Sequence, residues 1–291
     1  MSIIHKVVVV GGGVLGSQIA FQTAYCGFDV TILERENFVN EAIKKVEKLR
    51  FIYLKKVDDM KHDAPFSRGI TGIEKEKLTQ QDYVEFRNRI EWACHTINVT
   101  SDFQKACKNA DLVIEAVTEN PKVKIGLYKK LSNYLEDHTI LTTNSSTILP
   151  SILAPYTGRP EKYLAIHFAN HIWEFNTSEI MGHEGTNQEC IDAVVQFAKE
   201  INMVPLRMLK ENKGYILNAM LIPLLTSAQG LWVKGVAEPE TIDKTWKYAT
   251  GSQHGPFEIV DHVGIKTAYD IVSMSPNAKD PKSHFIKLPT N

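Results

Sequence analysis

A run of four valines near the N-terminus leads directly into a segment in which Gly11, Gly13 and Gly16 are spaced G-x-G-x-x-G. The β-branched run predicts a buried strand, and the stretch after the glycines predicts a helix. Gly11 permits a tight turn, Gly13 lets a ligand approach the backbone, and Gly16 lets the helix pack closely on the strand. The N–H groups of Val14 and Leu15 begin the helix and attract an anion. The segment therefore predicts a turn that binds the pyrophosphate of a dinucleotide.

The second predicted strand, residues 30–33, ends in an acidic residue that bears on the choice of dinucleotide. Glu34 lies eighteen positions after Gly16. A carboxylate at this place bonds both hydroxyls of the adenosine ribose and repels a 2′-phosphate. Arg35, the next residue, favours the opposite choice because an arginine here can receive that phosphate. We expect NAD as the cofactor, with Arg35 as the one contrary signal.

Length, charge and cysteine spacing exclude several classes of protein. A chain of 291 residues is long enough for two domains. Its 33 basic and 34 acidic residues give a net charge of −1, which offers no reason to expect a nucleic acid or a membrane as partner. The four cysteines lie far apart, so we expect reduced thiols and no metal site. With no signal peptide and no long apolar window in the sequence, we expect a cytoplasmic protein.

Strand-like and helix-like segments alternate over the first two thirds of the chain. The expected strands are residues 7–10, 30–33, 97–99, 112–116, 140–143, 164–168 and 204–206. Such alternation predicts an α/β fold of the Rossmann type, with a doubly wound, mostly parallel sheet. We expect this domain to span 1–206, with a helical hairpin inserted at about 36–96.

The inserted hairpin consists of two helical stretches, roughly 38–56 and 74–94, where an ordinary crossover uses one helix. The first is rich in cations, including Lys48 and Lys55. One interpretation is the solvated face of a long hairpin. The other is a cationic arm beside the cofactor cleft that binds a substrate carrying phosphates.

The strand pattern stops after residue 206, which predicts an all-helical C-terminal domain over 207–291. Its expected helices lie near 213–233, 239–250, 255–262 and 265–274. Pro223 predicts a kink or break in the first of them. The apolar excess of that helix exceeds what one face needs, which favours burial on several sides, in the domain core and in a subunit interface.

A catalytic base is expected at the carboxyl end of a late strand, where open α/β sheets place their ligands. His167 lies near the end of the predicted strand 164–168. A base that works near neutral pH needs a partner for its second ring nitrogen, and the nearest downstream carboxylates are Glu174 and Glu179.

Two polar segments follow the neighbouring strands. Residues 144–147, N-S-S-T, come directly after the strand at 140–143. These small side chains suit an active site, but they equally suit an N-cap for a helix that begins near Ile148. Glu119 follows the strand at 112–116, and it is either a helix-capping carboxylate or a residue that faces the nicotinamide side of the cofactor.

The order of six motifs resembles that of the L-3-hydroxyacyl-CoA dehydrogenase family, which includes the 3-hydroxybutyryl-CoA dehydrogenases. The motifs are G-x-G-x-x-G, E-A-V-x-E-N-x-K-V-K, T-N-S-S, H-F-x-N with a glutamate twelve residues after its histidine, K-G-Y-I-L-N and G-P-F-E-I-V-D-x-V-G. They cover nearly the whole chain. The resemblance implies NAD-dependent oxidation of an L-3-hydroxyacyl-CoA to the 3-ketoacyl-CoA, or the reverse, in fatty acid metabolism. It also implies a homodimer through the C-terminal domain.

The resemblance also implies roles for particular residues. His167 is then the general base and Glu179 its orienting carboxylate. Three residues are implied to contact the 3-oxygen and thioester region or to reach the substrate from the helical domain: Ser146, Asn170 and Asn218. Three residues are implied to line the NAD site: Glu119, Lys124 and Ser146. The helix with Lys48 and Lys55 matches the arm on which such enzymes place the nucleotide end of coenzyme A.

The sequence departs from the family in two places. The usual H-F-F-N-P is here H-F-A-N-H, so that Ala169 and His171 replace an aromatic residue and a proline. This puts the acyl specificity in question, and His171 becomes a competing base. Family members usually continue into a glycine-rich tail, so we expect the helical domain of this chain to be shortened.

Two further interpretations compete with an acyl-CoA dehydrogenase. One is an oxidoreductase of the same fold that acts on a hydroxy acid or sugar acid without coenzyme A, which a merely solvated hairpin favours. The other is a non-catalytic NAD-binding or structural protein. The intact set of His167, Glu179, Ser146 and Asn218 argues against this last interpretation.

Overall fold

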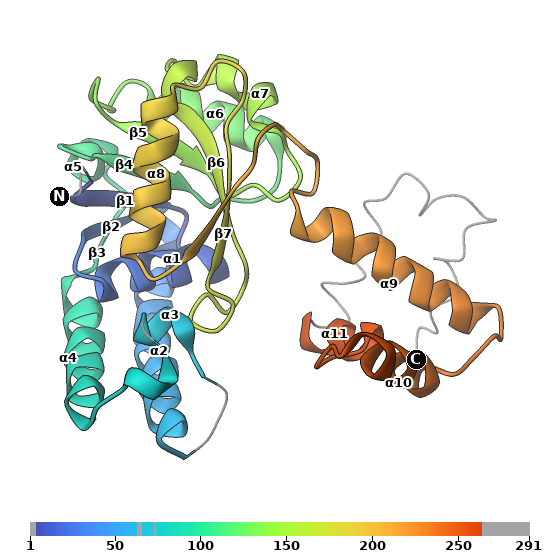
Figure 1. The fold of residues 1–291 in the computed structure, drawn as a ribbon. Coiled ribbons are helices and arrows are strands. Elements are labelled where there is room, and N and C mark those ends of the chain that lie inside the picture. The colour runs from blue at the N-terminus through green and yellow to red at the C-terminus, as the bar shows by residue number, and fades with distance from the viewer. Residues whose placement is uncertain (1–3, 63–65, 73, 264–291) are drawn as a thin grey trace. The chain divides into compact units, whose positions relative to one another are not determined.

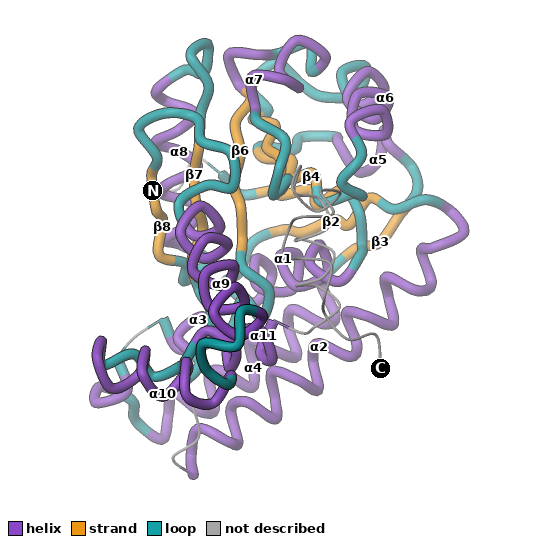
Figure 2. The backbone as a smooth tube through the Cα atoms, turned by 90° about the vertical axis from the view of Figure 1, so that its right-hand side faces the viewer, coloured by secondary structure: helices purple, strands orange, loops and turns teal. Residues whose placement is uncertain are grey.

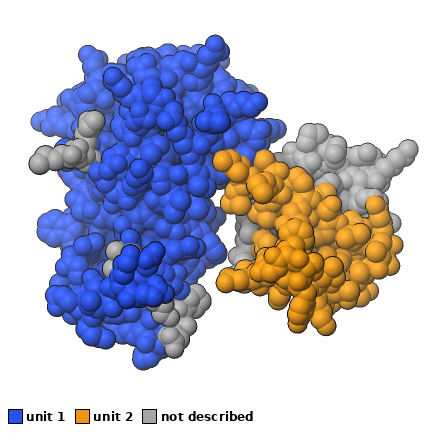
Figure 3. Space-filling view, in the orientation of Figure 1, with its two compact units in different colours: residues 1–215 blue, residues 216–291 orange. Residues whose placement is uncertain are grey.

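The computed structural model describes residues 4–62, 66–72 and 74–263. The chain divides into two compact units, Met1–Tyr215 and Ile216–Asn291, which are coloured separately in Figure 3. The first unit continues nine residues past the predicted boundary at 206. Tyr215 explains the difference, because it is buried and its hydroxyl donates a hydrogen bond to the Ser145 carbonyl inside the first unit.

The first unit is built on one eight-stranded sheet in the order β3-β2-β1-β4-β5-β6-β7-β8 (Figure 1). The strands are β1 Lys6–Val10, β2 Asp29–Leu33, β3 Asn98–Thr100, β4 Leu112–Glu115, β5 Ile140–Thr143, β6 Tyr163–Phe168, β7 Thr177–Met181 and β8 Val204–Arg207. The first six in this order are parallel, β7 is antiparallel to β6, and β8 is parallel to β7. The Rossmann-type, mostly parallel sheet is therefore confirmed.

Helices cover both faces of the sheet. Their bounds are α1 Val14–Tyr25, α2 Val39–Asp59, α3 Arg68–Thr71, α4 Gln80–Thr96, α5 Phe103–Cys107, α6 Pro121–Leu131, α7 Pro150–Leu153 and α8 Gln188–Glu200. Short 3-10 turns are η1 Glu36–Phe38, η2 Met60–His62, η3 Lys75–Lys77, η4 Ala154–Tyr156 and η5 Pro160–Lys162. One buried cluster joins the sheet to α1, α2, α4 and α8, and a second joins its other face to α5, α6 and α7. Strands β2 and β3 lie on one side of β1, and β4 and the later strands lie on its other side. The strand order therefore reverses between β1 and β4. Sheets of this type bind ligands at the carboxyl ends of the strands at such a point.

Strand β7 is the one strand that the sequence did not predict. Its sequence, T-S-E-I-M, carries a single β-branched apolar residue and a glutamate in a fully buried part of the sheet. Polar side chains in a strand weaken the apolar pattern on which the prediction depends. The antiparallel register with β6 places Glu179 directly opposite His167.

The inserted hairpin is formed mainly by α2 and α4, which lie side by side (Figures 1 and 2). Arg50 of α2 pairs with Glu91 of α4 at 2.7 Å, and Arg87 of α4 pairs with Asp58 at the end of α2. Part of the cationic run therefore joins the two helices rather than facing solvent.

The second unit contains α9 Leu217–Val233, α10 Pro239–Thr250 and α11 Pro256–Val263. The Asp243 carboxylate on α10 accepts the N–H groups of Phe257 and Glu258 and so caps the first turn of α11. The sequence predicts a kink or a break at Pro223. Helix α9 continues through this residue, so a break does not occur. Within the described part of this single chain only Ala228 of α9 is buried, and the expected burial in a subunit interface stays a prediction. The predicted helix at 265–274 and the expected shortening of the tail lie outside the described residues.

Candidate functional site

The glycine turn between β1 and α1 has the geometry that each glycine was expected to permit. Gly11 has a φ of +102°, which favours glycine, and a Cβ there would lie 2.8 Å from the carbonyl oxygen of Ala116. A Cβ on Gly16 would lie 1.9 Å from the Gly11 carbonyl oxygen. A Cβ on Gly13, in contrast, would meet no described atom within 4 Å. The turn is therefore tight on the protein side and open on the side from which a phosphate approaches.

The first turn of α1 follows Gly13 and presents N–H groups that have no intrahelical partner, including those of Val14 and Leu15. Val14 is 69% exposed, so this helix start is accessible to a ligand. Open space at Gly13 and free amides directly after it are what a pyrophosphate needs. The residues present therefore fit a dinucleotide.

Glu34 stands beside the glycine turn at the end of β2. Its carboxylate accepts the N–H of Gly12 at 2.8 Å and that of Arg35 at 2.7 Å. The Arg35 guanidinium lies 4.4 Å from the centre of the Phe38 ring, and its side chain is 80% exposed. A carboxylate fixed at the turn by two backbone groups is placed to accept ribose hydroxyls and to repel a 2′-phosphate.

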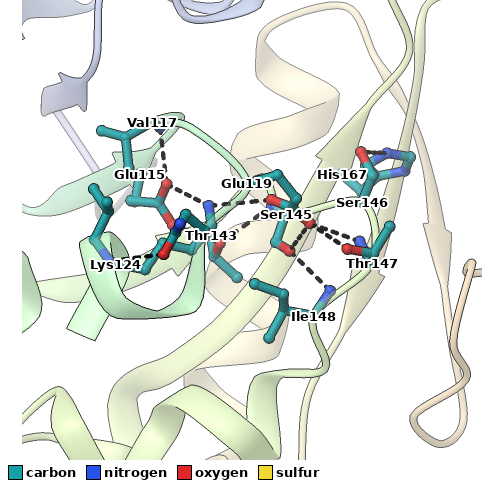
Figure 4. A network of polar contacts seen from close by, with 12 residues as sticks. Glu115, Val117, Glu119, Lys124, Thr143, Ser145, Ser146, Thr147, Ile148 and His167 are labelled. Carbon is teal, nitrogen blue, oxygen red and sulfur yellow. Dashed lines mark hydrogen bonds and ion pairs between the residues drawn. The ribbon is translucent and has the colours of Figure 1, made fainter. Parts of the chain in front are cut away.

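A buried ion-pair network begins at the end of β4, the neighbour of β1 (Figure 4). Glu115 and Lys124 are both fully buried and pair at 2.6 Å. The other Glu115 oxygen accepts the hydroxyls of Tyr128 at 2.6 Å and Thr143 at 2.7 Å. A buried charge pair is tolerated only where its remaining bonding capacity is satisfied, and these hydroxyls meet that condition.

Lys124 connects this buried network to Glu119, which lies 3.4 Å from the same ammonium. One Glu119 oxygen accepts the Ser145 hydroxyl at 2.5 Å and both the N–H and the hydroxyl of Thr147, at 2.9 and 2.8 Å (Figure 4). Burial acts to raise the pKa of Glu119, but the hydrogen bonds from Ser145 and Thr147 and the charge of Lys124 outweigh it and lower that pKa. Glu119 is therefore ionised, and its hydrogen bonds hold the loop after β5 in place.

The structure tests the capping interpretations of Glu119 and of the N-S-S-T segment. Asn120, not Glu119, caps α6, because its side chain accepts the N–H groups of Lys122 and Val123. The helix expected near Ile148 begins at Pro150 and has no side-chain cap, although the Ser145 hydroxyl does accept the Ile148 N–H at 3.0 Å. The segment serves mainly as a loop that is held by Glu119.

His167 lies near the end of β6 with a partner at each ring nitrogen. Its Nδ1 lies 3.0 Å from Oε2 of Glu179, and its Nε2 lies 3.1 Å from Oγ of Ser146. A carboxylate can only accept, so Nδ1 carries a proton and Nε2 of the neutral ring is left as an acceptor. His167 and Glu179 are 8% and 3% exposed. The arrangement is an oriented imidazole whose basic nitrogen faces a hydroxyl.

The other carboxylate considered as a partner, Glu174, instead forms an ion pair with Lys56 of α2. It lies in the loop after β6, where His171 has a φ of +57°. The N–H groups of His171 and Ile172 donate to Oε1 of Gln18 on α1, at 2.9 and 3.4 Å. His171 is exposed and stacks on Trp173, so its ring does not share the environment of His167.

The remaining predicted substrate residues are spread over the chain. Asn170 is exposed in the loop after β6, and Asn218 lies on α9 of the second unit. Lys48 and Lys55 are exposed on α2, and in the described ranges neither has an ion-pair partner. Lys45 differs from them, because its ammonium pairs with Glu41 and donates to the carbonyl of Gly12.

Two residues at the site were missed by the sequence reasoning. Glu115 was counted only as the end of a strand, and a buried acidic residue in an apolar run is the signal that points to it. Tyr215 lies within the K-G-Y-I-L-N motif, and its ring is stacked on the ring of His167 with centroids 4.4 Å apart. No local pattern reveals that contact, since 48 positions separate the two residues.

Models of two domains of one protein family match the chain. The model of the 3-hydroxyacyl-CoA dehydrogenase NAD-binding domain matches residues 6–212, and that of the 3-hydroxyacyl-CoA dehydrogenase C-terminal domain matches residues 214–289. The chain belongs to the 3-hydroxyacyl-CoA dehydrogenase family. Its cofactor is NAD, and as a member of this family it is an NAD-dependent dehydrogenase.

Three relatives illustrate how similar known proteins are to this chain. Human mitochondrial hydroxyacyl-coenzyme A dehydrogenase is 30% identical over 271 residues, which cover 93% of this chain and 79% of the relative. The structure of (S)-3-hydroxybutyryl-CoA dehydrogenase from Ralstonia eutropha is 25% identical, with a TM-score of 0.73 and coverage of 93% and 86%. The structure of a diketoreductase that acts on dicarbonyl compounds is 44% identical, with a TM-score of 0.82 and coverage of 94% and 89%.

Two expected absences concern only the part of the chain that the structure describes. There, no group of three or more histidine, cysteine or acidic side chains is arranged to hold a metal ion. No helix within those ranges is both long and apolar enough to cross a membrane.

The glycine turn yields a matched pair of substitutions. Gly16→Ala places a Cβ against the backbone of Gly11, so we expect it to destabilise the chain by about 1–3 kcal/mol. Gly13→Ala meets open space, so we expect a loss of about 1 kcal/mol or less, together with a roughly tenfold or greater loss of NADH affinity. Thermal unfolding without cofactor and titration of NADH fluorescence measure the two effects. Unchanged NADH affinity in Gly13→Ala would contradict the assignment of the phosphate side.

Proposed function

We propose that the chain oxidises a 3-hydroxy compound to the 3-oxo compound, or catalyses the reverse, with His167 as the acid/base group and Glu179 as its orienting partner. The observation that carries this proposal is the double hydrogen bonding of His167, to Glu179 at Nδ1 and to Ser146 at Nε2. A hydroxyl seated at Nε2 has a base within reach of its proton. The family membership supplies the class of reaction.

In this mechanism, Nε2 of His167 accepts the proton of the substrate's 3-hydroxyl as the hydride leaves the same carbon. When bound, NAD supplies the hydride acceptor, and its reduced form supplies the donor for the reverse reaction. Glu179 holds the ring tautomer and offsets the charge of the imidazolium that forms. Ser146 keeps the substrate oxygen near Nε2, and Asn170 contacts the oxygen and carbonyl region. The substrate contact of Asn218, on α9, stays a prediction from the family resemblance. In the reverse direction His167 returns the proton to the developing alkoxide.

The proposed cofactor contacts follow the described geometry. The amides of Val14, Leu15 and the glycine turn hold the pyrophosphate, and Glu34 accepts the ribose hydroxyls. Glu119 lines the nicotinamide side. Lys124 is fully buried with Glu115, so it acts by holding Glu119 rather than by contacting the cofactor directly.

We propose an acyl-CoA thioester as the substrate because of the cations on α2. Lys48 and Lys55 are exposed and lie seven positions apart, about two helical turns, with exposed Phe51 between them. Lysines that have no carboxylate partner suit phosphates, and an exposed aromatic ring suits a base. The curated relatives at about 30% identity act on hydroxyacyl-CoA or 3-hydroxybutyryl-CoA.

The second candidate is a dicarbonyl compound without coenzyme A, which the 44% identity to a diketoreductase favours. Ala169 and His171, the two residues that depart from the usual family motif, closely follow His167 in sequence and agree with a changed substrate. A non-catalytic role is disfavoured, because His167, Glu179 and Ser146 are arranged for proton transfer.

We further propose a homodimer through the second unit and a cytoplasmic location. On α9, Met220 is 70% exposed and Leu231 is 43% exposed, which leaves apolar surface for a second copy of the chain. The location stays a prediction, since the relatives include mitochondrial enzymes as well as bacterial ones.

Replacing Glu179 with glutamine removes the charge that compensates the imidazolium. We expect kcat to fall by about 10²- to 10⁴-fold, with the NADH dissociation constant within about twofold of wild type. Glu174→Gln is the matched control, because Glu174 pairs with Lys56 and not with His167. Near wild-type turnover of Glu179→Gln would refute the role of this pair.

The substrate class is tested by following NADH oxidation with acetoacetyl-CoA, free acetoacetate and ethyl acetoacetate. For a thioester enzyme, we expect the double variant Lys48→Glu with Lys55→Glu to raise KM about tenfold for acetoacetyl-CoA alone. The control pair with equal charge change is Lys199→Glu with Lys210→Glu, on exposed positions away from α2. Turnover of the ester but not of the thioester would establish the second candidate, and NADH binding without turnover of any of the three would refute an enzyme of this class.

Sedimentation velocity at micromolar concentration tests the proposed dimer. We expect a species of two chains for the wild type and a shift toward one chain for Met220→Glu, because a charge on an apolar interface is costly to bury. A wild-type species of one chain at all concentrations would contradict the proposal.

A further inference from the structure

Among the residues that the structure describes, Tyr215 is the one aromatic side chain that lies against the imidazole of His167. The two rings are nearly parallel, with an angle of 17° between their planes and 4.4 Å between their centres. The Tyr215 hydroxyl donates a 2.6 Å hydrogen bond to the carbonyl oxygen of Ser145. Ser145 directly precedes Ser146, whose hydroxyl faces Nε2 of His167. A single side chain therefore contacts both His167 and the residue that directly precedes Ser146.

The backbone around Tyr215 adopts an uncommon conformation that directs this ring. Tyr215 has a φ of +56° and Gly214 a φ of +81°, so the backbone of both residues lies in the left-handed region. A bulky residue adopts this conformation rarely, and such residues cluster at functional sites. Asn212 holds the turn, because its amide donates to the Tyr215 carbonyl at 2.8 Å and its own carbonyl accepts the Tyr215 N–H at 3.1 Å.

We propose that Tyr215 is a positioning residue for the proton transfer: its ring fixes the plane of the His167 imidazole and stabilises the imidazolium that forms during oxidation. This inference rests on the proposed role of His167 as the acid/base group. It adds a third contact to the two that the hydrogen bonds of His167 supply.

Geometry gives the first part of the argument. Hydrogen bonds at Nδ1 and Nε2 lie in the plane of the imidazole, and they leave the ring able to rock about the line that joins the two nitrogens. A parallel ring at van der Waals distance blocks that rocking on one face. The Ser145 bond holds the phenol in place, so the blocking surface is itself fixed.

Charge gives the second part. The face of an aromatic ring attracts a cation within about 6 Å, and the attraction grows when water is excluded. Tyr215 is 1% exposed and His167 is 8% exposed, so this contact is dry on the Tyr215 side. The stacked ring therefore favours the charged form of His167, in addition to the effect of Glu179.

The groups that face His167 come from three parts of the first unit. Glu179 approaches from β7, Ser146 from the loop after β5, and Tyr215 from the segment after β8. Glu119, from the loop after β4, acts on Tyr215 at longer range. Burial raises the pKa of the Tyr215 hydroxyl far above neutral, so this phenol stays protonated.

The alternative is that Tyr215 is a core residue with no influence on the chemistry, since it packs with Ala165 and Met181. Tyr25 provides a matched control for that alternative. It is also 1% exposed, and its hydroxyl donates to a backbone carbonyl, that of Ile70, at 2.8 Å. It lies on α1 against the hairpin and makes no contact with His167.

The test compares Tyr215→Leu, Tyr215→Phe and Tyr25→Leu in the full chain. In Tyr215→Leu the site stays apolar and the ring is lost, so we expect kcat to fall tenfold or more while the KM for NADH changes less than twofold. We expect the pKa of His167, read by NMR titration of labelled histidine with His167→Asn as the assignment reference, to fall by about half a unit. Tyr215→Phe keeps the ring and should keep the wild-type pKa. Tyr25→Leu should lower the melting temperature without moving that pKa.

An unchanged His167 pKa in Tyr215→Leu, with a kcat loss that only follows the loss of stability, would overturn the inference. If Tyr215→Leu does not fold, Tyr215→Met replaces it, and the same two measurements decide. Failure of the proposed function has a different signature, because His167→Asn would then keep its turnover. An inactive His167→Asn together with a wild-type-like Tyr215→Leu would refute the role of Tyr215 alone.

Discussion

The antiparallel pairing of β6 with β7 creates the site, because it places Glu179 directly across the ladder from His167. Residues opposite each other in a sheet point to the same face, so the two side chains meet without help from a loop. A shift of the register by one residue would turn Glu179 to the other face of the sheet. In an otherwise parallel sheet the pairing also reverses the chain direction, and β8 then runs parallel to β7. The relative position of His167 and Glu179 is thus fixed by backbone hydrogen bonds.

A second set of contacts connects the core to the loops at the strand ends. Glu115 and Lys124 are buried, and Lys124 also faces Glu119, which holds Ser145 and Thr147. The buried pair contributes little net stability by itself, because desolvation offsets most of the attraction. Its structural effect is to hold the Glu119 side chain in one position. Glu119 in turn holds the loop that carries Ser146. The position of the loop that carries Ser146 therefore depends on the buried ammonium of Lys124.

Much of this arrangement was predictable from sequence because it follows local patterns. The glycine turn, Glu34 and the position of His167 all come from a strand followed by a characteristic residue type, and the fold class came from the alternation of strands and helices. Strand β7 was missed because its buried residues are partly polar. Tyr215 was missed because its stacking depends on a left-handed turn distant in sequence from His167. The substrate is harder to predict from sequence than the fold. The sequence does not show which cations of α2 form ion pairs, as Arg50 does, and which have no such partner.

The loop after β6 shows how a departure from a family pattern becomes fixed. Family members usually carry proline where this chain has His171, whose φ is +57° and whose N–H donates to Gln18. Proline is confined to a φ near −65° and has no N–H to donate. A proline at position 171 would therefore require a reversed backbone dihedral and leave a buried amide oxygen on α1 without its main donor. The contact between this loop and α1 thus depends on a residue that can adopt a positive φ and still donate its N–H.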